Sequence, residues 1–278
     1  MRVRKPVLPS GWYPQTPASI ETFISRVRAS YSSQKFNEQD AIACIVPHAG
    51  WTFSGSIALS ALLSLKKDPE TIVVLGGHLG PSQQPLMLME DGAETPFGIF
   101  PIDVSFRNIL LEKIQCKADV FQDNTVEVQL PFLHYLFPES QLLWMRMPAN
   151  MISYELGKTI AAIAAAHHKD IRVVGSTDLT HYGPNYDFTP MGDGETAYQW
   201  VTKENDASFI KAILAMDRET VLQKATNDLA ACSVGAVLGI MGFGELNKTL
   251  KPELLAYGTS RDVYASDSFV GYASIIWH

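Results

Sequence analysis

Imidazole side chains follow two short apolar runs near the start of this chain. His48 comes soon after the run Ala41 to Val46, and His78 soon after the run Thr71 to Leu75. Neutral imidazole binds zinc, iron and copper. If the two runs are strands that lie near one another in a sheet, they deliver both histidines to one edge. A lone histidine more often only hydrogen-bonds the end of its strand, but two histidines in the same position favour a metal site.

A carboxylate and an imidazole follow a third apolar run. Asp178 and His181 come after Ile171 to Val174, within the segment Ser176 to Gly183. An aspartate beside a histidine can orient the imidazole ring and fix its tautomer, as a general acid or base requires. Asp178 can equally cap a helix or turn that begins at this point. We predict that His181 is the acid/base residue, and both roles of Asp178 stay open.

Two further side chains have chemistry that suits such a site. Cys232 lies near the start of a predicted helix over Leu229 to Met241. A helix N-terminus or an adjacent cation lowers the pKa of a thiol and favours the thiolate, which binds metal. A buried, inert cysteine is the common alternative. Glu127 lies among apolar residues in the segment Asn124 to Pro131 and is predicted to support a histidine ligand.

The elements that position these residues alternate between strands and helices. The predicted strands are Ala41 to Val46, Thr71 to Leu75, Leu142 to Met147, Ile171 to Val174, and an antiparallel pair, Leu254 to Gly258 and Phe269 to Trp277. The predicted helices are Ile57 to Leu65, Val104 to Ile114, Val126 to Phe137, Tyr154 to His168, Thr196 to Leu214, Arg218 to Ala225 with Asp217 as N-cap, and Leu229 to Met241. This alternation predicts an α/β fold, one domain over residues 1–278 with a central mixed sheet and helices on both faces. Ligand sites in such folds lie beyond the carboxyl ends of the strands, where the three histidines and Asp178 are expected.

Composition limits the class of protein. Hydrophobic residues make up 46% of the chain and charged ones 18%, which is enough for a large core and is not typical of disorder. The longest apolar stretch, Ile160 to Ala166, is well short of the roughly 20 residues that span a bilayer. The basic N-terminus leads into prolines and glycine and not into an apolar signal region, so a cytoplasmic location is expected.

Charge and cysteine content narrow the expected partners. A net charge of -7 argues against a broad nucleic-acid surface, which needs clustered Lys and Arg. The three cysteines are too few for a disulfide framework. We therefore expect a small-molecule substrate or a peptide as the partner, with no nucleic acid and no membrane. Formation of a homo-oligomer is left open.

Several motifs occur in an order that resembles the Memo family over nearly the whole chain. They are Ser10-Gly11-Trp12-Tyr13, Pro47-His48-Ala49-Gly50-Trp51 with Ser54-Gly55, the His78 strand end, Glu127 with Leu130-Pro131, Ser176 to Gly183, Tyr257-Gly258-Thr259-Ser260 and Val270-Gly271-Tyr272-Ala273. The Memo family is related in fold to the catalytic subunits of class III extradiol ring-cleaving dioxygenases, which use non-haem Fe(II). The resemblance therefore implies a fold like that of those subunits.

The resemblance also implies roles for individual residues. It implies three metal ligands, which are His48, His78 and Cys232. It makes His181 the acid/base residue that faces the open coordination side, with Asp178 and Glu127 in support. The dioxygenases have a carboxylate as third ligand, whereas a thiolate selects softer metals such as copper or zinc. The expected cofactor is one divalent or redox-active ion, which is iron, copper or zinc.

The sequence departs from the family pattern at the second ligand. Family members usually have Leu-Gly-Pro, then Ser or Asn, then His, and Leu75-Gly76-Gly77-His78 is one residue shorter. An alternative alignment puts Leu79-Gly80-Pro81-Ser82 on this motif and Gln83 where His belongs. We prefer His78 because Ile72 to Leu75 is the predicted strand.

A second departure lies around Glu127, where the family pattern often has neighbouring histidines. Asn124 and Gln129 stand there instead.

The prediction is a metal-binding protein with a small-molecule site at the strand ends and dioxygenase-like oxidoreductase chemistry. A non-catalytic scaffold that holds metal or a peptide and a metal-dependent hydrolase are the alternatives.

Overall fold

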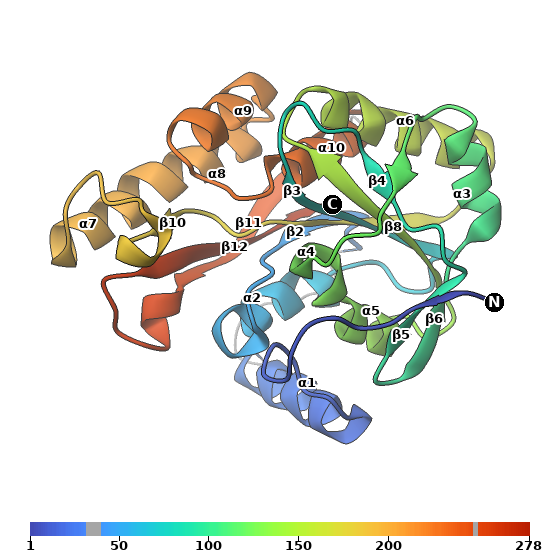
Figure 1. Ribbon diagram of the computed structural model, residues 1–278, viewed down its shortest axis with the longest axis horizontal. Helices are drawn as coiled ribbons and strands as arrows, with labels where there is room; N and C mark the ends of the chain where they lie inside the picture. Colours follow the sequence, from blue (N-terminus) through green and yellow to red (C-terminus); the bar gives the residue numbers. More distant parts are fainter. Residues whose placement is uncertain (32–39, 247–249) are drawn as a thin grey trace.

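The computed structural model describes residues 1–31, 40–246 and 250–278 (Figure 1). Its strands are β1 (Val3–Arg4), β2 (Ala43–Val46), β3 (Thr71–Leu79), β4 (Leu86–Met87), β5 (Gly92–Thr95), β6 (Gly98–Pro101), β7 (Lys117–Ala118), β8 (Gln141–Pro148), β9 (Ile171–Ser176), β10 (His181–Tyr182), β11 (Pro252–Thr259) and β12 (Phe269–Trp277). Its α-helices are α1 (Pro17–Tyr31), α2 (Trp51–Leu63), α3 (Val104–Leu111), α4 (Asn124–Glu127), α5 (Leu130–Leu136), α6 (Ile152–Ala166), α7 (Gly194–Trp200), α8 (Asp206–Leu214), α9 (Arg218–Asn227) and α10 (Val234–Leu246). A π-helical turn (Val201–Asn205) links α7 to α8, and two 3₁₀ turns occupy Pro184–Tyr186 and Ser260–Asp262.

A large mixed sheet forms the centre of the molecule, as predicted. Its strand order is β10-β12-β2-β9-β3-β8-β4-β7, with β11 paired to β12. The central strands β2, β9, β3 and β8 are parallel, whereas β12 runs antiparallel to β2 and β4 antiparallel to β8. The antiparallel pairing of β11 with β12 confirms the predicted pair at the C-terminus. A second, three-stranded sheet, β1-β5-β6, was not predicted.

Helices cover both faces of the large sheet (Figure 1). Successive side chains of a strand point to opposite faces, so a strand buried on both sides contributes to two cores. In β3, Val73 and Leu75 pack into the core with α3, α6 and α8 to α10. Ile72 and Val74 pack into the core with α1, α2 and α5. The continuous apolar run of β3 is therefore explained by burial from both sides.

Two of the elements whose bounds differ from the prediction affect the site. The strand β3 continues past Leu75 to Leu79, with an irregular register against β8 after Gly76, so His78 lies within it. The helix predicted from Leu229 begins at Val234. Cys232 therefore lies in the loop that precedes α10.

Two predicted helices are interrupted. The helix predicted over Val126 to Phe137 is two short helices, α4 and α5, and Pro131 lies in the first turn of α5, where its missing N–H costs least. The helix predicted over Thr196 to Leu214 contains the π-helical turn. Such turns are often found at functional sites. Here the turn ends at Asn205 and Asp206, which are both buried.

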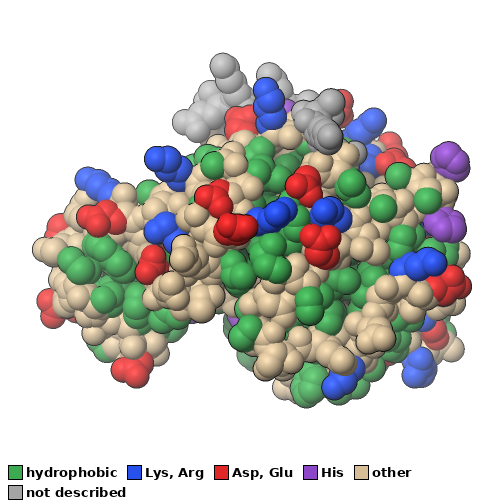
Figure 2. Space-filling model, turned by 90° about the horizontal axis from the view of Figure 1, so that it is seen from above, with side chains coloured by type: hydrophobic (Ala, Val, Ile, Leu, Met, Phe, Trp, Pro, Cys, Tyr) green, Lys and Arg blue, Asp and Glu red, His purple; other side chains and the backbone are tan. Residues whose placement is uncertain are grey.

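The surface adds two observations. Within the described ranges, no helix combines the length and the apolar character that a membrane span needs. On the face shown in Figure 2, blue Lys and Arg side chains are interspersed with red Asp and Glu, and neither sign forms a continuous tract. This face therefore offers no stripe of positive charge.

Candidate metal centre

The carboxyl ends of β2 and β3 deliver two histidines to one edge of the sheet. These two strands are not neighbours, because β9 lies between them and pairs with both. His48 follows β2 and is buried, and His78 lies near the end of β3 with its side chain 33% exposed. The two imidazole rings are nearly perpendicular, with centroids 5.0 Å apart. The strands β2, β9 and β3 therefore form this edge together.

Cys232 joins the two histidines from the loop before α10. Its Sγ lies 3.2 Å from Nε2 of His48. One potential ligand atom from each of His48, His78 and Cys232 lies within 4.8 Å of the other two. Sulfur and nitrogen ligands of one tetrahedral zinc ion, at about 2.3 and 2.0 Å from the metal, are about 3.5 Å apart. The donor types and their spacing therefore fit a single metal ion.

Glycines before His78 let the end of β3 approach its neighbours closely. A Cβ on Gly77 would overlap the side chain of Ser233, which follows Cys232 in the chain, and a Cβ on Gly76 would overlap Thr125 of α4. His78 itself has a left-handed backbone with φ of +59°, which is unfavourable for a residue with a Cβ. The backbone therefore holds His78 against the Cys232 loop at a cost in local strain.

Gln83, the alternative second ligand, is engaged elsewhere. Its Oε1 accepts a hydrogen bond from the backbone N–H of Gly80 at 2.5 Å, within its own turn. The side chain is exposed and lies outside the cluster of His48, His78 and Cys232. The geometry thus favours the alignment that uses His78.

The loop around His48 is fixed by amides that stand where the family pattern has histidines. Gln129 donates to the Pro47 carbonyl at 2.7 Å and to Ser176 Oγ at 3.3 Å. Ser176 Oγ also lies 3.2 Å from Nδ1 of His48. Asn124 donates to the His48 carbonyl at 3.0 Å. These contacts leave Nε2 of His48 facing Cys232.

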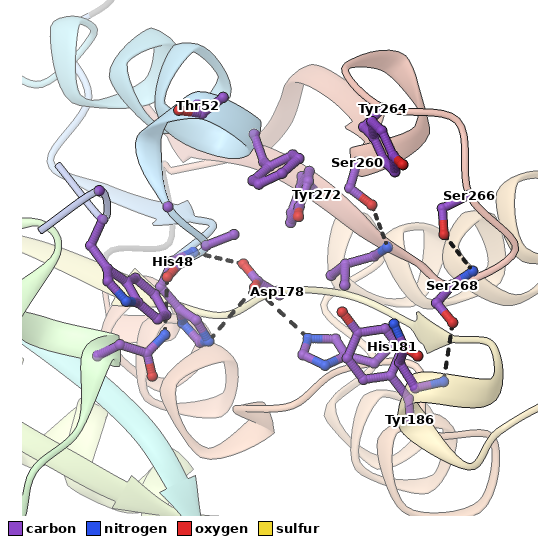
Figure 3. Close-up of a pocket in the computed structure, with 18 of the residues that line it drawn as sticks. His48, Thr52, Asp178, His181, Tyr186, Ser260, Tyr264, Ser266, Ser268 and Tyr272 are labelled. Carbon is purple, nitrogen blue, oxygen red and sulfur yellow. Dashed lines mark hydrogen bonds and ion pairs between the residues drawn. The ribbon is translucent and has the colours of Figure 1, made fainter. Parts of the chain in front are cut away.

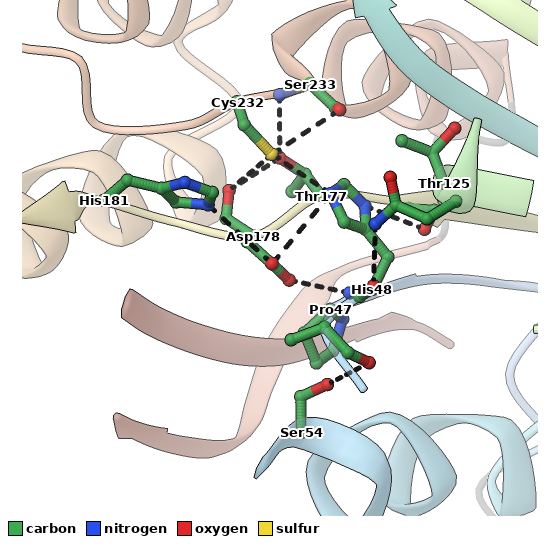
Figure 4. Close-up of polar contacts among 12 residues, drawn as sticks. Pro47, His48, Ser54, Thr125, Thr177, Asp178, His181, Cys232 and Ser233 are labelled. Carbon is green, nitrogen blue, oxygen red and sulfur yellow. Dashed lines mark hydrogen bonds and ion pairs between the residues drawn. The ribbon is translucent and has the colours of Figure 1, made fainter. Parts of the chain in front are cut away.

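Asp178 lies between the imidazoles of His48 and His181 (Figure 4). Its Oδ1 accepts the backbone N–H of His48 at 2.6 Å. Its Oδ2 lies 3.9 Å from Nε2 of His48 and 3.8 Å from Nε2 of His181. No helix begins here, since the next described element is the strand β10, so the helix-cap interpretation of Asp178 is wrong. The carboxylate instead joins the two imidazoles.

His181 lies beside a cavity, with its ring facing Asp178 (Figure 3). Its side chain is 34% exposed, and its ring centroid lies 4.9 Å from that of Tyr186. Its Nε2 is itself buried and has no hydrogen-bond partner. Burial lowers the pKa of His181, but the polar interactions of the ring with the nearby Asp178 and Cys232 outweigh burial and raise the pKa to about 10. The imidazole is thus biased toward its protonated form.

The thiol and the imidazoles shift one another's charge states. Burial opposes ionisation of Cys232, but the charge of His48 and hydrogen bonds from the three imidazoles hold the pKa of the thiol well below its usual value. Burial lowers the pKa of His78, yet hydrogen bonds with Asp123 and Cys232 raise it to about 10. Without a metal, the cluster therefore favours a thiolate surrounded by protonated imidazoles. A thiolate is the form of cysteine that binds metal.

The cavity beside these residues has a volume of about 760 Å³. Its wall draws residues from four stretches of the chain and from the site itself: Pro9, Ser10, Gly11, Trp12, His48, Ala49, Gly50, Thr52, Phe53, His78, Asn124, Asp178, His181, Asn185, Tyr186, Ser260, Tyr264, Ser266, Ser268, Val270 and Tyr272. Aromatic rings and serine hydroxyls dominate this wall in Figure 3. Neither Lys nor Arg contributes to it, and Asp178 is the one carboxylate that does. The cavity therefore suits a small ligand that places apolar or hydroxyl groups against the wall.

Glu127 has a different role from the one predicted. Its carboxylate accepts the backbone N–H groups of Val7 and Leu8, both at 2.9 Å, and the Tyr13 hydroxyl at 3.1 Å. These contacts hold the N-terminal segment that supplies residues 9–12 to the cavity wall. Glu127 thus supports the cavity and does not support a histidine.

Two acidic residues near the site were missed by the sequence prediction. Asp123 Oδ2 lies 2.9 Å from Nδ1 of His78, although 45 positions separate the two residues. Asp206 Oδ1 accepts both the backbone N–H and the hydroxyl of Thr180, at 3.1 and 2.5 Å. Asn205 donates to the same hydroxyl at 3.0 Å. Only an N-cap pattern was visible at Asp123, and no local signal pointed to Asp206.

The fold and the site together define an α/β protein with a candidate His₂Cys metal site at the strand ends. The chain belongs to the Memo-like family, because the family model described as Memo-like protein matches residues 4–276. A MEMO1 family protein of Thermococcus onnurineus is 30% identical over 99% of both chains. One from Pyrococcus furiosus is 31% identical over 99% of this chain and 98% of its own. A crystal structure of an uncharacterized Escherichia coli protein aligns with a TM-score of 0.47 at 15% identity, over 84% of this chain and 98% of that chain.

Proposed function

We propose that this protein binds one iron, copper or zinc ion and acts as a metal-dependent oxidoreductase on a small molecule in the adjoining cavity. The ligands in this proposal are His48, His78 and Cys232. The observation that carries it is the spacing of their donor atoms, with Sγ of Cys232 only 3.2 Å from Nε2 of His48. A bound ion supplies a Lewis acid at this position, and iron or copper adds redox chemistry.

Three protein ligands are typical of catalytic metal sites, which keep a further position open. Both ligand histidines contribute to the wall of the cavity, so a small molecule can approach the same point as the ion. Aromatic side chains line part of this space, and a wall of low polarity strengthens polar interactions at the site. The cavity and the ligand set therefore support one function.

His181 is the residue that moves a proton in this proposal. Its Nε2 makes no hydrogen bond to the described residues, so it can make one to a bound molecule. Asp178, 3.8 Å away, stabilises the charged form of the ring, so that His181 can donate a proton and be restored to its charged form afterwards. Thr180 lies between Asp178 and His181 in the chain, and it is held by hydrogen bonds with Asp206 and Asn205.

Metal uptake tests the site itself, and oxygen consumption separates the proposed oxidoreductase from the metal-binding alternatives. The purified protein is freed of metal with a chelator and titrated anaerobically with Fe²⁺, Cu⁺ or Zn²⁺, and elemental analysis then gives the metal content per chain. We expect one ion per chain in the wild type, and failure to take up any of the three would contradict the proposal. Oxygen consumption with catechol-type substrates then distinguishes an oxygenase from a metal-binding scaffold. Turnover without oxygen consumption would favour a hydrolase.

A further inference from the structure

A second buried ionic cluster lies behind His78, on the side away from Cys232. Arg146 of β8 contacts the carboxylates of Asp123 and Asp119, at 3.0 and 3.4 Å. The three side chains are at most 7% exposed. Arg146 Nε also donates to the Gly77 carbonyl at 3.0 Å, next to His78 in the chain. Buried charges are retained where they are paired, and this cluster holds two carboxylates against one guanidinium.

The hydrogen bonds of Asp123 determine which of its oxygens faces His78. Its Oδ1 accepts the backbone N–H of Thr125 at 2.8 Å and the Thr125 hydroxyl at 2.5 Å. Its Oδ2 faces Nδ1 of His78 at 2.9 Å and Arg146 at 3.0 Å. An ionised carboxylate only accepts hydrogen bonds, so it requires a proton on Nδ1 of His78. The nitrogen that remains to bind a metal is Nε2.

We propose that Asp123, held by Arg146, is a positioning residue that keeps the proton of His78 on Nδ1 and so turns Nε2 toward the metal. This inference rests on the proposed metal site. A metal-bound histidine generally donates its other ring N–H to a carboxylate, carbonyl or water, which fixes ring and tautomer. For His48 the corresponding group is Ser176, which is uncharged. His78 thus differs from His48 in having a charged partner at Nδ1.

The substitution Asp123→Asn tests this role because it keeps the shape and the helix cap. The two donors of Thr125 require an oxygen at the Oδ1 position, so the amide nitrogen must occupy the position of Oδ2. There it meets Nδ1–H of His78 and the Arg146 guanidinium, so three donors converge without an acceptor. His78 avoids this conflict by moving its proton to Nε2, and it then cannot bind metal through that atom.

The experiment measures the Zn²⁺ dissociation constant by competition with a chromogenic chelator. We expect Asp123→Asn to raise this constant about 10- to 100-fold, the usual effect of losing such a partner. The matched control is Asp103→Asn, because Asp103 is also a buried helix N-cap paired with a cation, Lys169, but it contacts the start of β3. This control should bind Zn²⁺ as the wild type does. If the wild type and Asp123→Asn bind Zn²⁺ with equal affinity, the role of Asp123 is wrong but the metal site stands. If the wild type takes up no Zn²⁺, the proposed metal site is wrong too.

A spectroscopic readout separates this role from a general loss of stability. In the Zn²⁺-loaded protein labelled with ¹⁵N-histidine, two ligand rings should show Nδ1–H correlations, and the one bonded to a carboxylate should lie further downfield. Asp123→Asn should remove this downfield signal and leave that of His48. If the variant does not fold, the wild-type spectrum still decides, because a His78 ring that carries its proton on Nε2 contradicts the inference.

Discussion

The sulfur of Cys232 lies 3.2 Å from Nε2 of His48, although 184 positions separate the two residues in the chain. The contact is made where the loop before α10 meets the end of β2. Burial of this pair is unfavourable unless the charge on sulfur is compensated. The surrounding imidazoles, or a bound cation, provide that compensation.

Removal of the thiol tests the third ligand. We expect Cys232→Ser to weaken Zn²⁺ binding by at least about tenfold, because a thiolate is the ligand that best suits zinc and copper. Cys116→Ser is the control, since Cys116 is a free thiol outside the cluster. The measurement is metal content after gel filtration together with the dissociation constant. Unchanged binding in Cys232→Ser would remove the sulfur from the ligand set.

His181 should be dispensable for metal binding and required for chemistry. Because His181 lies outside the cluster of three ligands, His181→Ala should keep one Zn²⁺ per chain. Any turnover that the metal-loaded protein shows should fall about 10²- to 10⁴-fold, as for loss of a general acid or base. Elemental analysis beside the activity assay checks both. Loss of the metal from His181→Ala would make His181 a ligand.

Thiol reactivity should reveal the charge state of the metal-free site. Burial raises the pKa of Cys232, but His48 and the other imidazoles outweigh it and hold the pKa well below its usual value. Burial raises the pKa of Cys116 to about 11. At pH 7, iodoacetamide should therefore modify Cys232 before Cys116, as followed by peptide mass spectrometry. Prior loading with Zn²⁺ should protect Cys232, and modification of Cys116 first would contradict the proposed charges.

Asp206 should make the protein less stable as the pH rises. Burial raises the pKa of Asp206 to about 6, against hydrogen bonds from Thr180 and Tyr257 that lower it. Between the ordinary aspartate value and about 6 the native state binds more protons than the unfolded state, so the free energy of unfolding falls as pH rises through this window. The fall is on the order of 2 to 3 kcal/mol. This fall in the free energy of unfolding should be largely absent in Asp206→Asn. It should persist in the control Asp193→Asn, because Asp193 is an exposed N-cap that makes no cap hydrogen bond. Urea unfolding from pH 4 to 7 measures it, and an equal fall in Asp206→Asn would contradict the account.

The close approach of β3 to the Cys232 loop gives a prediction for packing. A Cβ on Gly77 would overlap Ser233, so Gly77→Ala should destabilise the protein by about 1 to 3 kcal/mol and weaken Zn²⁺ binding. Gly80→Ala is the control, because a Cβ at Gly80 meets only Gln83 Oε1, at an ordinary 3.5 Å. Thermal unfolding and metal titration of both variants check this. Equal behaviour of the two would show that the approach at Gly77 does not position His78.

Much of the fold and part of the site could be predicted from local patterns. His48 follows an apolar run of strand length, and the carboxyl ends of parallel strands meet at one edge of a sheet. The same pattern found His78, although β3 runs beyond it. Cys232 lies in a loop, where periodicity gives no signal. The predicted helix start near it favoured a thiolate, and the resemblance to the Memo family implied that it is a ligand. Its position depends on the packing of Ser233 against Gly77.

Contacts between distant segments explain what could not be predicted. Asp123 contacts His78 directly, and Arg146 of β8 contacts both Asp123 and the Gly77 carbonyl, but no spacing along the chain encodes these contacts. Glu127 lies close to Asp123 in the chain, yet its carboxylate accepts hydrogen bonds from the backbone N–H groups of the N-terminal segment. The π-helical turn that brings Asn205 and Asp206 to Thr180 is set by tertiary packing, since the sequence pattern alone indicated a continuous helix.

X-ray absorption at the zinc edge of the Zn²⁺-loaded protein tests the metal centre most directly. The account predicts one zinc ion per chain with one sulfur at about 2.3 Å and nitrogen or oxygen ligands at about 2.0 to 2.1 Å, two of them showing imidazole scattering. The sulfur should be absent from the spectrum of Cys232→Ser. A wild-type protein that takes up no zinc, or one whose zinc has no sulfur ligand, would contradict it.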